Sequence, residues 1–487
     1  MDVSRAAERG KMEEVNDIIE QRYVNLDKMK SRNMEPFGGV FKGTESIASV
    51  KDAFEEGKQV RLAGRVMAKR EHGKSVFMDL KDRTERIQIY IRKDTLGETV
   101  FDDLKVVDIG DMAGVDGKLF MTHSGEKTLL VSAFKMLSKS LLPLPEKWHG
   151  LKDVETRYRQ RYVDLIVNDS AKEKFLRRIH LIRHIREKLN EKGFLEVETP
   201  MMHPIPGGAA GKPFKTHHSA LDMDLFLRIA PEIYLKKLLV GGLEKVYEIN
   251  RSFRNEGIST RHNPEFTMME VYQAYSDCDG MMALTEELIR SAATSILGTE
   301  KFMYQDKEID LTVWKKVSFA ELMHENFGIK ADDPLEKWVE KLKKKGMDID
   351  GKKVSKTQLI NIVGDLVEPE AGTHPVFVVD MFKEISPLAK EKPGAPGIAD
   401  RFELYMGGME IANAYSELND PIEQEERFRA QVKDDPDAMV DEDFLRALRY
   451  GMPPAGGLGI GIDRLAMILT DSASIREVVF FPQMRPE

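Results

Sequence analysis

The sequence predicts a multidomain α+β protein in which a small β-barrel precedes a larger domain of mixed helices and strands. The hydrophobic pattern alternates with period two from about residue 59, and it becomes mixed after a segment rich in proline and glycine at 141–150. The chain has 487 residues, which is enough for two to four domains. Its composition, 41% hydrophobic and 32% charged, is that of a folded globular protein and excludes disordered and collagen-like classes.

Composition also excludes several kinds of site. The single cysteine, Cys278, rules out an intrachain disulfide and any multi-cysteine metal site, and it suits a reducing compartment. The N-terminal segment is charged from its second residue, and no run reaches the roughly 18 apolar residues of a membrane span. We therefore expect a cytoplasmic protein. The net charge of −9 argues against indiscriminate nucleic-acid binding but permits a local basic surface.

Residues 1–58 are expected to form an N-terminal helical extension, because 11–33 has apolar residues at helical spacing between charged ones. Residues 59–143 then contain five short alternating runs, which predicts a small barrel of the oligonucleotide-binding (OB) kind. The runs are 59–70, 74–82, 86–93, 111–120 and 127–137.

One part of the predicted barrel has the composition of a nucleic-acid surface. Residues 59–90 hold eight lysines and arginines against four acidic residues, with Phe77 and Tyr90 among them. Basic residues interleaved with aromatic ones suit stacking on single-stranded bases. A solvated strand face over an aromatic core would give the same pattern, so both interpretations stay open here.

Residues 144–487 are predicted to form one larger domain, with an insertion within about 297–400. A strong helical pattern over 171–192 leads into a strand that ends at Pro200, and further helices are expected near 280–297 and 332–346. Strands are expected around 375–382 and 401–417.

The first concentration of chemically useful residues is the strand–loop–strand segment 244–275. Strand alternation places Glu248, Asn250, Ser252 and Arg254 on one face. On the return strand, the residues sharing a face are Phe266, Met268, Glu270 and Tyr272. Cations and an aromatic ring around one turn are typical of a site for a phosphate and a base.

The second concentration is the hairpin 400–421. If Met406 and Gly407 form a two-residue turn, Glu403 opposes Glu410, and opposed like charges call for a cation such as Mg²⁺. Strict alternation then puts Asn413 and later polar residues on the other face, so a bulge near 411–413 would be needed to join them.

The third is the glycine-rich segment 453–469, which is predicted to run from a strand into a helix capped by Asp463. Arg464 in the first turn opposes the helix dipole. Its presence there indicates a bound anion.

Together these segments resemble the three signature motifs of class II aminoacyl-tRNA synthetases: the strand ending at Pro200, residues 253–256, and residues 459–464. The barrel resembles the anticodon-binding domain of the subgroup that serves aspartate, asparagine and lysine. Within it, the similarity is greatest to lysyl-tRNA synthetases. The segments that carry it are 157–168 (RYRQRYVDLIVN), 204–214 (PIPGGAAGKPF), 230–242 (APEIYLKKLLVGG), 253–272 and 416–421 (SELNDP).

The resemblance implies an OB-fold barrel joined to a catalytic domain built on an antiparallel sheet with flanking helices. It also implies a homodimer that activates L-lysine with ATP and Mg²⁺, then transfers lysine to the 3′ end of tRNA(Lys). Helix 171–192 and the strand ending at Pro200 resemble the element that packs across the dimer axis in this family.

Residue roles follow from the same resemblance. It implies that Arg254 holds the α-phosphate and the amino acid carboxylate, and that Glu403 and Glu410 carry Mg²⁺. The implied ATP contacts are Arg254, Glu256, Arg261, His262, Asn263, Phe266, Glu403, Glu410, Gly459 and Arg464. The implied lysine contacts are Gly208, Glu232, Arg254, Glu270, Tyr272, Asn413, Tyr415 and Glu417, and the implied anticodon contacts are Arg70, Phe77 and Gln88.

Glu417 is the expected partner of the substrate ε-ammonium group, since it follows Asn413 and Tyr415 on one strand face. Two alternatives stay open. An aspartyl- or asparaginyl-tRNA synthetase would share the fold, but an aspartate pocket should present cations rather than Glu270 and Glu417. A non-catalytic nucleic-acid-binding relative would not need the set Arg254, Glu403, Glu410 and Arg464.

Overall fold

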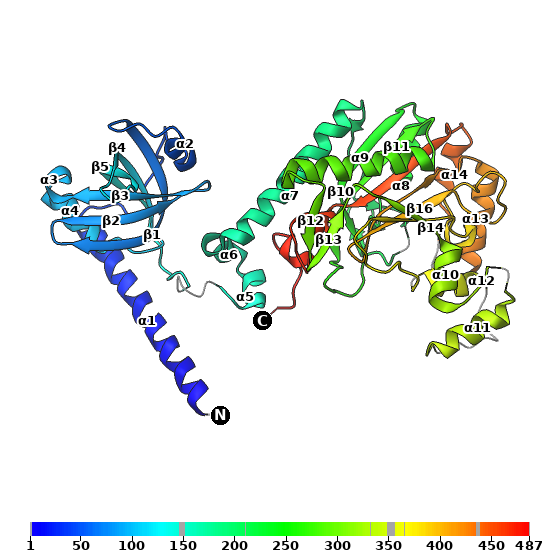
Figure 1. Ribbon diagram of the computed structural model, residues 1–487, viewed down its shortest axis with the longest axis horizontal. Coiled ribbons are helices and arrows are strands. Elements are labelled where there is room, and N and C mark those ends of the chain that lie inside the picture. Colours follow the sequence, from blue (N-terminus) through cyan, green and yellow to red (C-terminus); the bar gives the residue numbers. More distant parts are fainter. Residues whose placement is uncertain are drawn as a thin grey trace. The chain divides into compact units, whose positions relative to one another are not determined.

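The computed structural model describes residues 2–145, 151–209, 211–331, 333–347, 356–364, 366–434 and 439–486. It divides into two compact units, Met1–Lys152 and Asp153–Glu487, and each is described by itself (Figure 1). Residues 146–150 of the predicted linker lie outside the described residues. None of the helices in the described part of the chain combines the length and the apolar character that a membrane span needs.

The first unit is a closed five-stranded barrel with strand order β1-β2-β3-β5-β4, which confirms the predicted OB-fold (Figure 1). Its strands are β1 (Gln59–His72), β2 (Ser75–Lys81), β3 (Arg86–Arg92), β4 (Met112–Met121) and β5 (Lys127–Ser138). Alternate residues such as Val76, Met78 and Leu80 point into a buried core, as the period of two requires. Short helices complete the unit: α2 (Ile47–Asp52), α3 (Lys93–Leu96), α4 (Glu98–Asp103) and η1 (Leu104–Val106).

The predicted N-terminal helix is α1 (Asp2–Ser31), and its C-terminal half contacts the barrel. Met29 is fully buried, and Arg22 donates hydrogen bonds to the carbonyl groups of Ile109, Ser140 and Leu142. Within 15–31, where burial is described, the predicted apolar residue Leu26 is buried against the barrel, whereas Val15 and Ile18 are exposed.

The second unit is built on an eight-stranded sheet with the order β14-β15-β16-β17-β18-β11-β10-β6. Most neighbours are antiparallel, which confirms the expected antiparallel sheet. The strands are β6 (Leu195–Glu196), β10 (Lys245–Phe253), β11 (Glu265–Ala274), β14 (Lys315–Ser318), β15 (Val376–Val379), β16 (Arg401–Met406), β17 (Met409–Ser416) and β18 (Ala455–Gly461). Two small sheets lie beside it, formed by β7 (Met202–His203), β8 (Lys215–His218) and β9 (Met223–Leu227), and by β12 (Lys301–Tyr304) and β13 (Lys307–Asp310).

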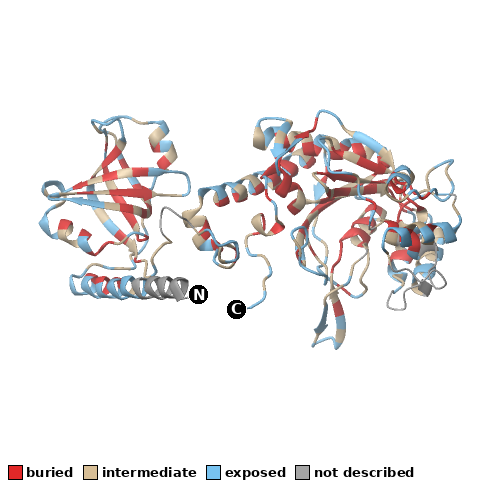
Figure 2. Cartoon of the chain, turned by 60° about the horizontal axis from the view of Figure 1, so that its bottom comes forward, coloured by how far each residue is buried: buried red, intermediate tan, exposed pale blue. Residues whose placement is uncertain are grey.

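Helices cover this sheet, and the buried residues concentrate between them and the strands (Figure 2). The main core joins α7 (Asp169–Glu191), α9 (Cys278–Leu297) and α15 (Ile462–Leu469) to the central strands, and Cys278 is buried there. The other helices are α5 (Val154–Arg159), α6 (Arg161–Val167), α8 (Glu232–Val240), α10 (Phe319–Phe327), α11 (Leu335–Lys344), α12 (Lys356–Gly364), α13 (Pro421–Asp434) and α14 (Glu442–Leu448), with η2 (Lys383–Ile385) and η3 (Ile475–Glu477).

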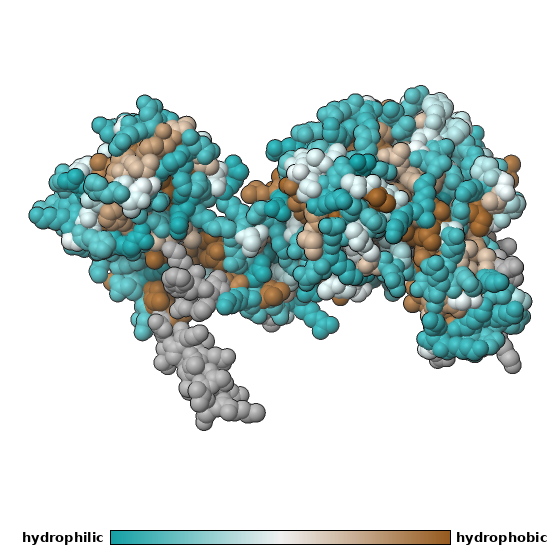
Figure 3. All heavy atoms as spheres, in the orientation of Figure 1, coloured by the Kyte–Doolittle hydropathy of each residue, from teal (hydrophilic) through white to brown (hydrophobic). Residues whose placement is uncertain are grey.

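The segment 297–400 contributes to the main sheet as well as extending beyond it. β14 pairs with β15, and β15 pairs with β16, so β14 and β15 form one edge of the sheet. Helices α10, α11 and α12 pack around a smaller core that includes the buried Trp338. The outer surface over α10 and α11 is strongly hydrophilic (Figure 3).

Candidate active site

The predicted hairpin of segment 244–275 is β10 and β11, and its register places Glu248 opposite Glu270 and Ser252 opposite Phe266. Arg254 follows the end of β10, and its guanidinium carbon lies 5.2 Å from the centroid of the Phe266 ring. The hairpin therefore brings the predicted cation and the predicted aromatic ring together, as a cation–π pair.

Arg254 is a largely buried guanidinium group that lacks a full set of partners. Its Nε is buried and has no hydrogen-bond acceptor among the described residues. Burial lowers the pKa of Arg254, and nearby Glu410 and Glu256 only partly oppose this. A buried donor without an acceptor is costly, so the geometry suits an anionic ligand.

The loop after β10 and the start of α15 form the rest of one cleft. Arg464 donates to the carbonyl oxygen of Glu410 at 2.8 Å, and its other nitrogen lies 3.0 Å from His262 Nε2. The cleft is lined by all the ATP contacts that the resemblance implies except Glu403: Arg254, Glu256, Arg261, His262, Asn263, Phe266, Glu410, Gly459 and Arg464.

The register predicted for the second hairpin is wrong. Gly407 and Gly408 form the turn between β16 and β17, both with positive φ, so Glu403 opposes Asn413 and Tyr405 opposes Glu410. The two glutamates are therefore not directly opposed.

The expected bulge is present in the same hairpin. Leu404 pairs with Ala412 while Tyr405 pairs with Glu410, so Ile411 is the extra residue on β17. This extra residue shifts the alternation and brings Glu410 onto the face that carries Glu403 and Asn413.

Glu403 and Glu410 fit a Mg²⁺ ion that is shared with phosphates. Burial raises the pKa of Glu403, and the nearby charge of Glu410 adds to the effect. Glu403 accepts hydrogen bonds from Arg401 at 2.6 Å and Tyr405 at 3.0 Å, whereas Glu410 lines the open cleft. Among the described residues no group of three or more potential ligands gathers, and Mg²⁺ of this kind takes only one or two carboxylates.

The third segment is β18 running into α15, but the predicted cap is wrong. Gly461 occupies the N-cap position, and Asp463 lies inside the first turn. The Asp463 carboxylate instead accepts hydrogen bonds from Arg178 of α7 at 2.6 Å and from the Thr267 backbone at 2.7 Å. It therefore ties α7 and β11 to α15.

A cluster of buried acidic side chains, Glu232, Glu270 and Glu417, adjoins this cleft, since Glu270 pairs with the cleft residue Gly459. We call this cluster the acidic pocket, and its first half comes from α8 and the end of β17. Glu232 accepts hydrogen bonds from the Tyr415 hydroxyl and the Lys236 ammonium group, each at 2.7 Å. Lys236 also forms an ion pair with Glu417, and both side chains are fully buried. A Cβ on Gly208 would lie 3.1 Å from that of Glu232, so the predicted α-amino contacts are adjacent.

The second half of the pocket comes from β11. Glu270 is buried, and its carboxylate accepts a hydrogen bond from the Tyr272 hydroxyl at 3.0 Å, with no cation in ion-pair contact among the described residues. Burial raises the pKa of Glu270 well above its ordinary value, and the charges of Glu232, Glu248 and Glu417 raise it further. Glu270 is therefore a buried carboxylate whose charge no cation among the described residues compensates.

Gly457 of β18 makes room for the pocket. It pairs with Tyr272 on one side and Tyr415 on the other. A Cβ added at this position would meet Glu417 Oε1 at 1.9 Å and the Tyr272 ring at 2.7 Å. Only glycine leaves space there for the buried carboxylate.

On the barrel, the predicted anticodon residues share one surface. Phe77 and Tyr90 are directly opposed on β2 and β3, and their rings stack with centroids 4.5 Å apart. Arg70 opposes Phe77 on β1, and Gln88 lies two residues before Tyr90 on the same face of β3. The aromatic residues are thus partly exposed on a basic strand face rather than enclosed in the core.

Two important residues were missed from the sequence. Lys236 follows Glu232 at the i, i+4 spacing of a helical ion pair, which was the available signal. Arg401 precedes Glu403 on the same strand face, where it also donates to Asn413 Oδ1 at 3.1 Å.

A mostly antiparallel sheet on which the segments 244–275, 400–421 and 453–469 line one cleft, in a chain that also carries an OB-fold, is the architecture of a class II tRNA synthetase. Comparison with known families gives the same class. Residues 153–485 match the family described as "tRNA synthetases class II (D, K and N)", and residues 60–137 match "OB-fold nucleic acid binding domain".

Individual relatives are similar over almost the whole chain. A lysine--tRNA ligase of Carboxydothermus hydrogenoformans is 52% identical, with 97% of this chain and 99% of that protein covered. A lysine--tRNA ligase from Pelotomaculum thermopropionicum is 52% identical over 98% of this chain and 96% of that protein. Another, from Bacillus subtilis, is 47% identical over 97% of this chain and 98% of that protein. The chain therefore belongs to the lysine--tRNA ligase family of class II tRNA synthetases.

Proposed function

We propose that the protein activates L-lysine with ATP and then transfers lysine to the 3′ end of tRNA(Lys). The observation that carries this proposal is the acidic pocket, in which Lys236 pairs with two of three buried carboxylates, Glu232 and Glu417, and the third, Glu270, has no ion-pair partner among the described residues. With all three carboxylates ionised, the formal charge of the pocket is about −2, which matches the two ammonium groups of lysine.

Within the pocket, each charged group of lysine has a proposed partner. Arg254 would bind the substrate carboxylate, Glu232 and the backbone at Gly208 the α-ammonium, and Glu270 the ε-ammonium. We assign Glu270 first because Glu417 already has Lys236 as a partner, whereas the described residues place no cation in contact with Glu270. Glu417 would offer its Oε1 as a second acceptor for the ε-ammonium group, and Tyr272, Asn413 and Tyr415 would line the remainder.

Activation then requires positioning and charge neutralisation rather than proton abstraction. A carboxylate oxygen of lysine forms a bond to the α-phosphorus, and the bond to the β-phosphate oxygen breaks to release pyrophosphate. The attacking carboxylate is already ionised, so no general base is needed, and Arg254 and Arg464 can offset the developing phosphoryl charge. In the second step a ribose hydroxyl attacks the activated carbonyl and AMP leaves.

Glu403 and Glu410 would hold Mg²⁺, which supplies further charge neutralisation on the phosphates when bound. Arg401 and Tyr405 orient Glu403 for this role through their hydrogen bonds. Phe266 would stack on adenine, with Arg261, His262, Asn263, Glu256 and Gly459 around the nucleotide.

Pyrophosphate exchange measured with each of the twenty amino acids tests this proposal. We expect exchange only with lysine and only with Mg²⁺ present. Exchange with aspartate or asparagine, and none with lysine, would favour the alternative enzymes of the same fold. No exchange with any amino acid would favour a non-catalytic relative.

The barrel surface is proposed to read the anticodon of tRNA(Lys). Its support is the stacked pair Phe77 and Tyr90, flanked by Arg70 and Gln88. An exposed aromatic platform with neighbouring cations is the arrangement that binds unstacked bases.

A homodimer is proposed from the exposed apolar residues of the element that resembles the family's dimer contact. Leu176 and Ile179 on α7 are 40% and 44% exposed, and Leu195 of β6 is 53% exposed. Such a surface suits burial against a second copy. Sedimentation equilibrium should show a dimer at assay concentrations, and a fully active monomer would contradict it. We propose a cytoplasmic location, on the support of the single cysteine.

A further inference from the structure

Lys236 is a buried cation with no access to water. It lies on α8 one turn after Glu232, and its side chain is fully buried. Its ammonium group contacts both Glu232 and Glu417, and it lies 5.5 Å from the ring centroid of Tyr415 and 6.0 Å from that of Phe444. A desolvated ammonium group persists only where carboxylates compensate it.

The contact is asymmetric at Glu417. Its Oε2 forms the ion pair with Lys236, whereas Oε1 lies over Gly457, and the described residues donate a hydrogen bond to neither oxygen. Lys236 therefore holds one carboxylate oxygen by charge and leaves the other available within the pocket.

We propose that Lys236 is a positioning residue for lysine selection: its ammonium group orients Glu417 and reduces the cost of ionising it beside the substrate. This inference rests on the proposed function, in which the pocket binds the two ammonium groups of lysine.

The charges around Glu417 support the inference. The titratable groups that face it are Lys236 and Glu232 from α8, Glu270 and Tyr272 from β11, and Tyr415 from β17. Burial raises the pKa of Glu417 to about 8, Lys236 opposes this rise, and Glu232 adds to it. Without Lys236 the pKa of Glu417 would be higher still, and a substrate ammonium group would have to displace a proton held more firmly.

The test is the pH profile of kcat/KM for lysine in pyrophosphate exchange. In Lys236→Met we expect a KM for lysine about 100-fold higher near neutral pH, a smaller change in kcat, and an unchanged KM for ATP. The loss should diminish as the pH rises, because Glu417 then ionises without its cation. Lys237→Met is the matched control, since Lys237 is on the same helix but pairs with Asp443 outside the pocket; its profile should match that of the wild type.

A double variant separates this role from a merely structural one. If Lys236 acts through Glu417, then Lys236→Met combined with Glu417→Gln should resemble Glu417→Gln alone, and the displaced pH dependence should disappear. The double variant also removes one buried charge of each sign, which favours folding if the single variant is unstable. Additive losses, or a profile that Lys236→Met does not displace, would overturn the inference. Wild-type inactivity with lysine would instead overturn the proposed function.

Discussion

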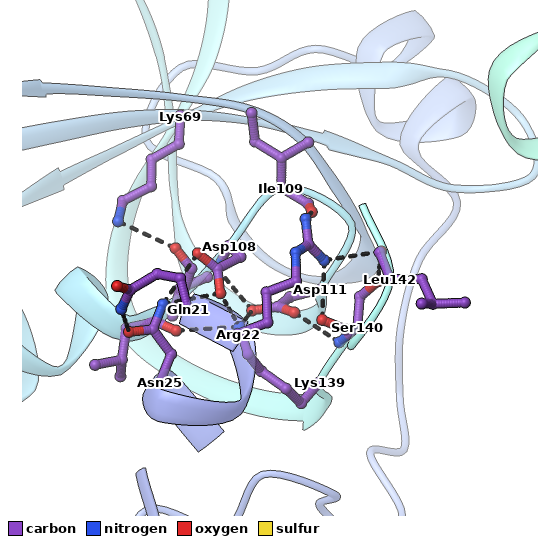
Figure 4. Close-up of polar contacts among 12 residues, drawn as sticks. Gln21, Arg22, Asn25, Lys69, Asp108, Ile109, Asp111, Lys139, Ser140 and Leu142 are labelled. Carbon is purple, nitrogen blue, oxygen red and sulfur yellow. Dashed lines mark hydrogen bonds and ion pairs between the residues drawn. The ribbon is translucent and has the colours of Figure 1, made fainter. Parts of the chain in front are cut away.

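Two of the protein's ionic clusters, one in each unit, differ in how well their charges are compensated. In the barrel, Lys139 pairs with Asp108 and, at 2.9 Å, with Asp111, where α1 meets the strands (Figure 4). Asp111 also accepts two backbone hydrogen bonds, from Asp108 and Ser140, each at 2.7 Å, and Asn25 of α1 donates to Asp108.

The acidic pocket of the second unit has the opposite balance. Lys236 is shared between Glu232 and Glu417, and Glu270 has only the Tyr272 hydroxyl. Buried polar groups are normally satisfied, so a cluster that is complete by itself is structural, whereas one that lacks cations is prepared for a cationic ligand. The two clusters therefore predict different responses to substitution.

The largest effect should come from neutralising the uncompensated carboxylate. Glu270→Gln should lower kcat/KM for lysine by about 10³-fold, since it removes the proposed partner of a desolvated ammonium group. Pyrophosphate exchange should show this loss with little change in KM for ATP. A larger loss in Glu417→Gln than in Glu270→Gln would mean that Glu417 is the main partner of the ε-ammonium group.

Breaking the compensated cluster should change stability instead of activity. Lys139→Met leaves the buried Asp111 and the partly exposed Asp108 without their cation and should destabilise the barrel by roughly 3–5 kcal/mol. Hydrogen exchange of amides in β4 and β5 would report this, with Lys135→Met as the control, since Lys135 is exposed on β5 shortly before Lys139. Lysine-dependent pyrophosphate exchange should be retained, and its loss would contradict a purely structural role.

On the barrel surface, Phe77→Ala should reduce tRNA aminoacylation while leaving pyrophosphate exchange nearly unchanged. Each base–aromatic stack contributes about 1–3 kcal/mol, so we expect a loss of about tenfold to a hundredfold in kcat/KM for tRNA. Parallel losses in both assays would indicate a folding defect.

The smallest effect should be a gain in stability from Glu270→Gln. The folded-state pKa of Glu270 is raised, so the folded state holds a proton that the unfolded chain loses above its ordinary pKa. The free energy of unfolding of the wild type should therefore fall as the pH rises from the ordinary pKa of Glu270 toward its raised pKa. Glu270→Gln should remove this fall, and its free energy of unfolding should be about 1–2 kcal/mol higher than that of the wild type at the alkaline end. Thermal unfolding at two pH values measures it, and equal slopes for both proteins would contradict it.

The fold and much of the site could be predicted because they depend on local patterns. Alternation identified all five barrel strands and the hairpin that carries Arg254. The face on which Glu410 lies could not be predicted directly, and the sequence indicated only that a bulge would be needed. One inserted residue, Ile411, reverses which face each later side chain occupies.

The errors came from tertiary contacts. Asp463 resembled a helix cap, but it is engaged by Arg178 from a helix 285 residues earlier in the chain. Lys236 was missed, because only the meeting of α8 with the end of β17 makes it a buried partner of Glu417. Such pairings depend on which elements meet, which the sequence spacing does not specify.

The most direct test of the central claim, that the acidic pocket awaits a cation, is the proton balance of lysine binding. Titration calorimetry near pH 7, in buffers of different ionisation enthalpy, measures the protons released per lysine bound. Burial raises the pKa of Glu270 well above its ordinary value, and a bound ammonium group lowers it, so we expect lysine binding to release protons and its affinity to rise with pH. The barrel variant Asp111→Asn should release the same number. Lysine binding without proton release, in a wild-type protein that binds lysine normally, would contradict the account.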